Sequence, residues 1–194
     1  MSGYVFNTRA ELDTAVDLWI SDETSAKDTY GEINNWNVSA ITDFSKLFFF
    51  KGINSDISKW DVSNGTDFSD MFNYSLKFNE DIGNWDVSSG TDFSGMFGNF
   101  SPFNQDISSW DVSSGTDFSS MFFFNKTFNQ DIGNWNVSNG TNFSRMFYSA
   151  DSFNQDIGNW DVSNGTNFSS MFYSADSFNQ DIGNWNVSNG TNFS

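Results

Sequence analysis

The chain contains neither cysteine nor histidine among its 194 residues. The lack of cysteine excludes disulfides and thiolate metal sites, and it leaves the redox compartment undetermined. Nucleophilic catalysis therefore lacks its most common base and its thiolate nucleophile. We expect a protein that is not an enzyme and that uses no cofactor and no metal.

Basic residues are also few. Eight Lys and Arg stand against 25 Asp and Glu, which gives a formal net charge of −17. Nucleic acids and anionic membranes attract clusters of Lys and Arg, so we expect no nucleic-acid partner. No apolar run approaches the ~20 residues of a membrane span, and we expect no membrane insertion. No Sec-type signal peptide is visible at the N-terminus.

Repetition is the main feature that the chain does have. From Trp60 onward a tryptophan recurs every 25 residues, and the intervening sequence recurs in phase with it. A fixed period of this length is typical of a solenoid or array. Because each buried aromatic ring removes a large area from water, we predict that rings of successive copies interlock into one continuous core. The tryptophan ladder comprises Trp36, Trp60, Trp85, Trp110, Trp135, Trp160 and Trp185.

Residues 1–30 differ from the repeats. Thr8 and Glu11 fit a capping box, and apolar residues follow at helical spacing, which predicts an amphipathic helix over residues 9–20. A solenoid needs its first hydrophobic end covered. We therefore predict an N-terminal helical cap over residues 1–30 and a tandem repeat solenoid over residues 31–194, with about 6.5 units, the last one incomplete.

The first half of each repeat has the pattern of a strand. In one copy Trp160 and Val162 alternate with polar neighbours, as a half-buried strand requires. The following residues 163–165, Ser-Asn-Gly, have the composition of a turn. Strands from successive copies are expected to pair in a parallel ladder.

The second half of each repeat has the spacing of a short helix. Phe168, Met171 and Phe172 stand at i, i+3 and i+4, which places them on one side of a helix. Thr166 is a suitable N-cap for it. The same role is predicted for the other threonines of this column, Thr42, Thr66, Thr91, Thr116, Thr141 and Thr191.

The units DISKWDVSNGTDFSDMF and FNQDIGNWDVSNGTNFSSMFYSADSFNQ resemble the BspA-family leucine-rich repeat surface proteins, with their tandem repeat of about 25 residues. The resemblance covers residues 31–194. It implies a leucine-rich-repeat-like solenoid displayed at a cell surface or outside the cell, with adhesion or protein binding as its role. Together with the repeat pattern it predicts an α/β solenoid, a parallel ladder of short strands opposite a wall of short helices. A mostly-β right-handed solenoid is the alternative.

Two polar columns accompany the tryptophans. Stacked equivalent asparagines can hydrogen-bond the backbone of the next coil and satisfy groups left unpaired at turns. This asparagine ladder comprises Asn54, Asn79, Asn104, Asn129, Asn154 and Asn179. The aspartate ladder comprises Asp56, Asp81, Asp106, Asp131, Asp156 and Asp181.

The aspartate ladder permits three interpretations. Its carboxylates can cap turns, bind calcium or form the paired carboxylates of a glycosidase. Equivalent copies argue against catalysis, because a catalytic pair needs two different environments. Turn capping is the favoured interpretation.

Taken together, the sequence predicts a non-enzymatic surface protein. It would present an acidic face rich in Asn, Asp and Ser for adhesion to a protein or glycan at a cell or particle surface. The alternative is a structural protein that self-associates through the uncapped C-terminal end, stacking end on end or forming filaments.

Overall fold

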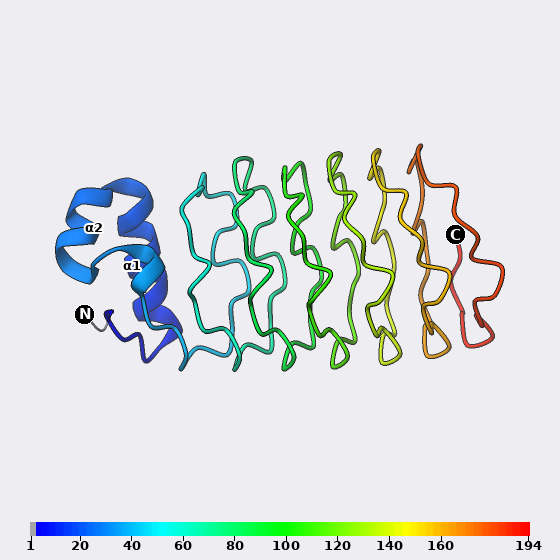
Figure 1. The fold of residues 1–194 in the computed structure, drawn as a ribbon, viewed down its shortest axis with the longest axis horizontal. Coiled ribbons are helices and arrows are strands. Elements are labelled where there is room, and N and C mark those ends of the chain that lie inside the picture. The colour runs from blue at the N-terminus through cyan, green and yellow to red at the C-terminus, as the bar shows by residue number, and fades with distance from the viewer. Residues whose placement is uncertain (1–2) are drawn as a thin grey trace.

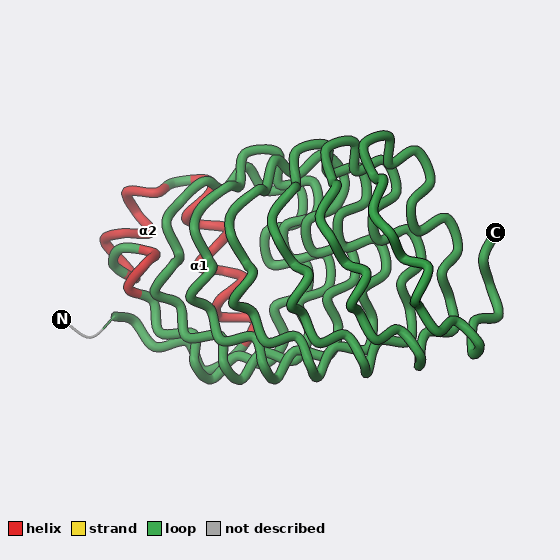
Figure 2. The backbone as a smooth tube through the Cα atoms, turned by 45° about the vertical axis from the view of Figure 1, so that its right-hand side comes forward, coloured by secondary structure: helices red, strands yellow, loops and turns green. Residues whose placement is uncertain are grey.

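The computed structural model describes residues 3–194. The chain winds into coils that stack along one axis, with two helices at the N-terminal end (Figure 1). The helical elements are α1 (Arg9–Ser21), α2 (Glu23–Tyr30) and the 3-10 helix η1 (Ile33–Asn35). The coils themselves consist of turns and loops (Figure 2). Residues 1–2 of the predicted cap lie outside the described residues.

The helix predicted over residues 9–20 is confirmed as α1. Its capping box is present: Glu11 N–H donates to the Thr8 hydroxyl at 3.3 Å, and Thr8 N–H donates to the Glu11 carboxylate at 3.2 Å. These contacts satisfy N–H groups that the first helical turn cannot pair. The buried face of α1 consists of Leu12, Ala15, Val16 and Trp19.

Helix α2 was not predicted. Asp22 ends α1 and caps α2 at once, because its carboxylate accepts the Ser25 N–H at 3.1 Å. Gly31 ends α2 with a φ of 78°, a conformation that glycine adopts without steric cost. The only buried residue of α2 is Ala26, so its apolar pattern is too weak to indicate a helix.

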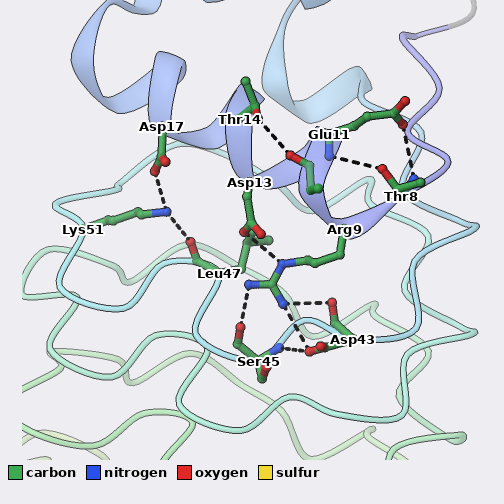
Figure 3. Close-up of polar contacts among 11 residues, drawn as sticks. Thr8, Arg9, Glu11, Asp13, Thr14, Asp17, Asp43, Ser45, Leu47 and Lys51 are labelled. Atoms are coloured by element: carbon green, nitrogen blue, oxygen red, sulfur yellow. Dashed lines mark hydrogen bonds and ion pairs between the residues drawn. The ribbon is translucent and has the colours of Figure 1, made fainter.

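Ion pairs and hydrogen bonds join α1 to the first coils (Figure 3). The Arg9 guanidinium contacts the Asp43 carboxylate at 3.1 Å and the Ser45 carbonyl at 2.6 Å. Lys51 contacts the Asp17 carboxylate at 2.8 Å. The helix therefore covers the first end of the stack and is tied to it by charged contacts.

The predicted parallel ladder of short strands is wrong. Successive coils share isolated parallel bridges, and residues 3–194 contain no strand. The segment interpreted as a strand is folded by tight turns: Trp85 N–H donates to the Ile82 carbonyl at 3.1 Å, and Gly90 N–H to the Val87 carbonyl at 2.8 Å. Turns, not extended backbone, produce the alternation of apolar and polar residues. The bridges within the repeats join Asp43 to Asp67, then Asp92, Asp117, Asn142, Asn167 and Asn192 in succession.

The predicted short helices are also wrong. In the segment predicted as a helix, the backbone N–H groups donate alternately to their own coil and to the next coil. Met71 N–H donates to the Phe68 carbonyl of its own coil at 3.2 Å, and Phe72 N–H donates to the Met96 carbonyl of the next coil at 2.9 Å. Asp70 has a φ of 54°, which a right-handed helix excludes. Both the α/β leucine-rich-repeat-like class and its mostly-β alternative are therefore replaced by stacked coils of consecutive turns. We name this segment the turn wall: 42–48, 66–72, 91–97, 116–122, 141–147 and 166–172.

The core is continuous from the cap to the last coils. Buried side chains from Phe6 to Met171 form one hydrophobic cluster. Within it, the Phe68 and Phe93 rings stack with centroids 5.6 Å apart and planes 4° apart, and Phe93 continues onto Phe118 at 5.7 Å. The predicted interlocking of aromatic rings from successive copies is confirmed. Since each coil covers the rings of its neighbours, the stack excludes water along its length.

Candidate functional site

The ladder tryptophans hold the coils together from the inside. Trp85 Nε1 donates to the Ile57 carbonyl of the preceding coil at 3.1 Å, and Trp110 Nε1 to the Ile82 carbonyl at 3.1 Å. From Trp36 to Trp160 no ladder indole is more than 4 % exposed, so this ladder is structural and offers no binding surface. The indole nitrogen of Trp36 differs, because it donates to the Gly31 carbonyl at 3.1 Å. The same contact to the preceding coil is made by Trp60, Trp135, Trp160 and the half-buried Trp185.

The ladder asparagines link the coils at the surface. The predicted bond to the backbone of the next coil is present: Asn104 N–H donates to the Asn79 side-chain oxygen at 2.8 Å. Asn54 differs, because the hydrogen-bonding pattern assigns its amide nitrogen to the side that faces the Lys77 carbonyl at 2.7 Å. The bond found between Asn79 and Asn104 is repeated at 2.9 Å between Asn104 and Asn129, Asn129 and Asn154, and Asn154 and Asn179.

Sequence reasoning missed a glutamine column beside this ladder. Gln130 Nε2 donates both to the Asn104 carbonyl at 2.9 Å and to its side-chain oxygen at 3.0 Å. Gln155 and Gln180 repeat both bonds one and two coils later. The recurrence of Gln after the last four ladder asparagines was the available signal.

Each coil from the second onward uses one local device at three corners. An Asp or Asn is followed by an apolar residue and then by a Ser or Gly, whose N–H donates to the side-chain oxygen of the Asp or Asn. In one coil Asp81, Asp86 and Asp92 accept this N–H at 2.9, 3.0 and 2.8 Å. The aspartate ladder occupies the first corner, where Asp56, Asp81, Asp106, Asp131, Asp156 and Asp181 all cap turns at 2.9 Å.

Turn capping also sets the charge of these carboxyl groups. The Ser88 hydroxyl, at 2.6 Å, and then its N–H, at 3.0 Å, hold the pKa of Asp86 below its ordinary value. Hydrogen bonds from serine lower the pKa of Asp106, Asp111 and Asp161 in the same way. Bonds that favour the ionised form keep it charged to lower pH, so these groups are carboxylates at neutral pH.

The first two corners lie on one surface of the stack, which we name the acidic wall. It consists of residues 54–64, 79–89, 104–114, 129–139, 154–164 and 179–189. Its buried residues are the Ile, Trp and Val of each coil before the last one, and its polar residues are half-buried or exposed. The charged residues of the acidic wall are Asp56, Lys59, Asp61, Glu80, Asp81, Asp86, Asp106, Asp111, Asp131, Asp156, Asp161 and Asp181.

No metal centre can be assembled from these columns. Within residues 3–194, no three Asp, Glu, His or Cys side chains converge on a point where an ion could bind. The column of carboxylates runs along the stack, and each carboxylate accepts the N–H of the residue two positions later in its own coil. The calcium interpretation of the aspartate ladder therefore gains no support from the geometry.

The threonine column does not cap helices, contrary to the prediction. Thr91 Oγ1 donates to the Thr66 carbonyl of the preceding coil at 3.1 Å, and Thr91 N–H donates to the same oxygen at 2.8 Å. The column is a further line of contacts between coils. A helix start was predicted here because the Phe and Met residues that follow have helical spacing.

The glycine before each of these threonines makes room for a ring. A Cβ atom at Gly90 would lie 2.5 Å from Phe93 Cζ and 3.0 Å from the Val87 carbonyl oxygen. The same contact recurs at Gly65, Gly115 and Gly140. Glycine thus lets the phenylalanine ring lie flat against the backbone of its own corner.

This architecture defines a repeat protein of stacked, turn-built coils whose polar ladders are structural and whose open surface is acidic. The chain belongs to the family described as "Mycoplasma protein of unknown function, DUF285", which matches residues 19–125 and 102–194. No curated protein and no solved structure matches the chain. Among residues 3–194, neither α1 nor α2 is long and apolar enough to cross a membrane.

Proposed function

We propose that the protein is a non-enzymatic repeat protein that presents its acidic wall to a protein or glycan partner at a cell or particle surface. The observation that carries the proposal is the wall itself, in which each coil repeats the same pattern of exposed Asp, Asn and Ser at fixed spacing. A repeated surface favours a partner that is itself extended or clustered, because many weak contacts then add.

The chemistry of the wall indicates the kind of partner. Carboxylates such as Asp86 and Asp111, kept ionised by serine, attract basic protein surfaces. Asn and Ser side chains beside them offer hydrogen bonds to sugar hydroxyls. The resemblance to BspA-family surface proteins supports the same role and a location at the cell surface or outside the cell.

An enzymatic role has less support. The equivalent carboxylates share one environment from coil to coil, whereas acid–base catalysis needs partners with separated pKa values. The chain has no histidine or cysteine to serve as base or nucleophile. A panel of hydrolase substrates should therefore give no turnover above buffer.

The test compares the natural chain with a variant that has fewer charges on the acidic wall. Binding of both proteins to protein and glycan arrays is measured. The variant is Asp86→Asn with Asp111→Asn and Asp161→Asn. Asparagine fits this corner, since Asn136 accepts the Ser138 N–H at 3.1 Å. We expect binding at neutral pH to fall at least tenfold while the melting midpoint stays close to that of the natural chain. Equal binding by both proteins would remove the acidic wall from the proposal.

Self-association through the last coil is the second candidate. A hollow of about 580 Å³ opens on this coil, and Phe193 is 57 % exposed there. Exposed apolar surface of this kind favours a covering partner. Light scattering over a concentration series tests it, because growth of the scattering mass should be lost in a Phe193→Asp variant. A strictly monomeric natural chain would exclude this candidate. The hollow is lined by Met171, Phe172, Ile182, Trp185, Val187 and Phe193 among others.

A further inference from the structure

A row of aromatic side chains lies outside the core, at the loops that join the turn wall to the acidic wall. We name these the tip loops: 49–52, 73–77, 98–102, 123–127, 148–152 and 173–177. Hydrogen bonds between neighbouring tip loops keep them in one row: Tyr74 N–H donates to the Gly98 carbonyl at 3.3 Å and Phe124 N–H to the Tyr148 carbonyl at 2.8 Å. The tip loops therefore form one edge of the stack.

Exposed apolar side chains gather on this edge. Within residues 31–186, all of which the structure describes, the large hydrophobic side chains that are exposed are Phe50 at 65 %, Leu76 at 60 %, Phe100 at 51 % and Tyr173 at 59 %. All four belong to tip loops. Between Phe100 and Tyr173 the row continues with the half-buried rings of Phe124 and Tyr148, and exposed apolar surface that exceeds single scattered residues favours an interaction site.

Backbone conformation gives no reason for these aromatics. Phe50, Tyr74, Phe100 and Phe124 have left-handed φ values of 56°, 56°, 65° and 54°. This conformation is strained for a bulky residue and is favoured by Gly or Asn. Asn99 occupies one such position. Tyr74 and Phe124 are half-buried, and Phe50 and Phe100 are exposed. Burial in the core therefore does not account for these aromatic side chains, and we look to a partner.

The orientation of the rings argues against a sugar. Phe50 and Tyr74 stack with centroids 4.2 Å apart and planes 10° apart, and Tyr148 stacks on Tyr173 at 4.8 Å. Phe100, Phe124 and Tyr148 in the middle of the row contact one another at tilted angles of 38° and 42°. A pyranose packs on an open ring face, which the stacked rings at the two ends of the row do not offer. The row of tip loops instead suits the apolar side chains of another protein.

The charges along the tip loops favour a second copy of this chain as that partner. The first two tip loops carry Lys51 and Lys77 and no acid, whereas the last two carry Asp151 and Asp176 and no base. Between them, Lys126 is the only charged residue. A second copy placed antiparallel brings basic tips against acidic tips at both ends, whereas a parallel copy would place like charges together.

We infer that two copies of the chain pair side by side in antiparallel orientation through their tip loops. The pairing is two-fold and self-complementary, as most homodimers are. Lys77 of one copy faces Asp151 of the other, and this contact occurs twice. The Phe100 and Phe124 rings of both copies meet at the centre.

Lys51 contributes less, because Asp17 binds it and its side chain is only 23 % exposed. Asp151 pairs with Lys126 in its own copy, but both side chains of that pair are exposed, at 39 % and 54 %, so Asp151 can also face Lys77. Both acidic walls stay open, so the dimer presents two of them.

The test is a charge exchange followed by sedimentation velocity. Lys77→Glu should weaken dimerisation at least tenfold, because two like-charge contacts replace two favourable ones. Asp151→Lys should weaken it equally; its ion pair with Lys126 is exposed, so little stability is lost. An equimolar mixture of the two variants should dimerise like the natural chain, to within about threefold, because the mixed dimer keeps one natural Lys–Asp contact and forms the other with reversed signs.

Matched controls are Lys59→Glu on the acidic wall and Asp28→Lys on α2, which make the same charge changes away from the tip loops. Their dimerisation should equal that of the natural chain, and thermal melts should show that all variants fold. A natural chain that stays monomeric at about 200 µM overturns the inference. Unchanged dimerisation in both Lys77→Glu and Asp151→Lys would also overturn the inference, and it would assign association to the last coil.

Cysteine cross-linking tests the orientation independently, because the chain has no cysteine of its own. Lys77→Cys and Asp151→Cys variants, mixed under mild oxidation, should form a disulfide-linked dimer. Each variant alone should cross-link at most weakly, since antiparallel copies keep equivalent residues apart. Equally efficient cross-linking by Lys77→Cys alone would indicate parallel pairing and overturn the inference.

Discussion

The indole nitrogen of Trp110 lies 3.1 Å from the carbonyl oxygen of Ile82, in the coil before its own. The same oxygen accepts the Trp85 N–H at 3.1 Å. One buried carbonyl thus joins a turn within a coil to the next coil along the stack. Local folding and stacking depend on the same acceptor.

Replacing this indole tests that dependence. Trp110→Phe removes the hydrogen bond and part of the buried ring, and we expect the free energy of unfolding to fall by about 1–3 kcal/mol. Urea unfolding followed by circular dichroism measures the loss. The matched control is Trp185→Phe, whose half-buried ring in the last coil should cost clearly less. Equal losses at both positions would contradict the role given to burial.

The glycine corners should reject any side chain. Gly90→Ala places a methyl group 2.5 Å from Phe93 Cζ, so the ring must move, and overpacking of this kind costs about 1–3 kcal/mol. Gly52→Ala is the control, because no atom lies within 4 Å of its added Cβ. Thermal melts should show a lower midpoint for the first variant and an unchanged midpoint for the second.

At positions of the turn wall with a left-handed backbone, a change to glycine should stabilise the fold. Ser120 has a φ of 56°, and Gly95 occupies the equivalent position one coil earlier. Ser120→Gly relieves the strain, and we expect a gain of about 0.5–1 kcal/mol in the free energy of unfolding. Ser119→Gly, at a residue without positive φ, should destabilise. A loss in both variants would show that the left-handed backbone carries no strain.

Acid should destabilise the stack through its turn caps. Folding lowers the pKa of Asp56, Asp86, Asp106, Asp111 and Asp161, so the unfolded chain binds protons at a higher pH than the folded one does. The stabilisation is present above the ordinary aspartate pKa, near 4. It is lost as pH falls through the lowered folded values. Denaturant titrations from neutral pH to about pH 2 measure this slope.

The same measurement on Asp86→Asn with Asp111→Asn and Asp161→Asn provides the control. Asparagine keeps the turn cap but does not titrate, so the variant should lose less stability than the natural chain over the acid range. Identical slopes for the two proteins would mean that these carboxyl groups do not cause the acid sensitivity.

The sequence revealed the features that depend on one short segment or on the repeat period. Helix α1 was predictable because the Thr8 and Glu11 capping box and the apolar face lie within one short segment. Burial of the aromatics was predictable because the 25-residue period places equivalent rings in register. The asparagine bonds followed from the same period.

The walls of the coil were not predictable in the same way. Spacing at i, i+3 and i+4, as in Phe68, Met71 and Phe72, fits a helix and a run of consecutive turns equally well. The choice depends on where alternate N–H groups find acceptors, and here they find them in the next coil. The three-corner pattern of Asp or Asn, apolar residue, then Ser or Gly was present in the sequence and would have indicated turns.

The coil-to-coil bridges have a consequence for how this molecule can vary. Asp92 pairs with Asp117, and Asp117 with Asn142, so each coil meets only its two neighbours in the same register. Gain or loss of one whole copy by recombination within the gene would lengthen or shorten the rod and leave every remaining junction intact. The length of the stack can therefore change between generations while the pattern of exposed residues on each coil stays the same.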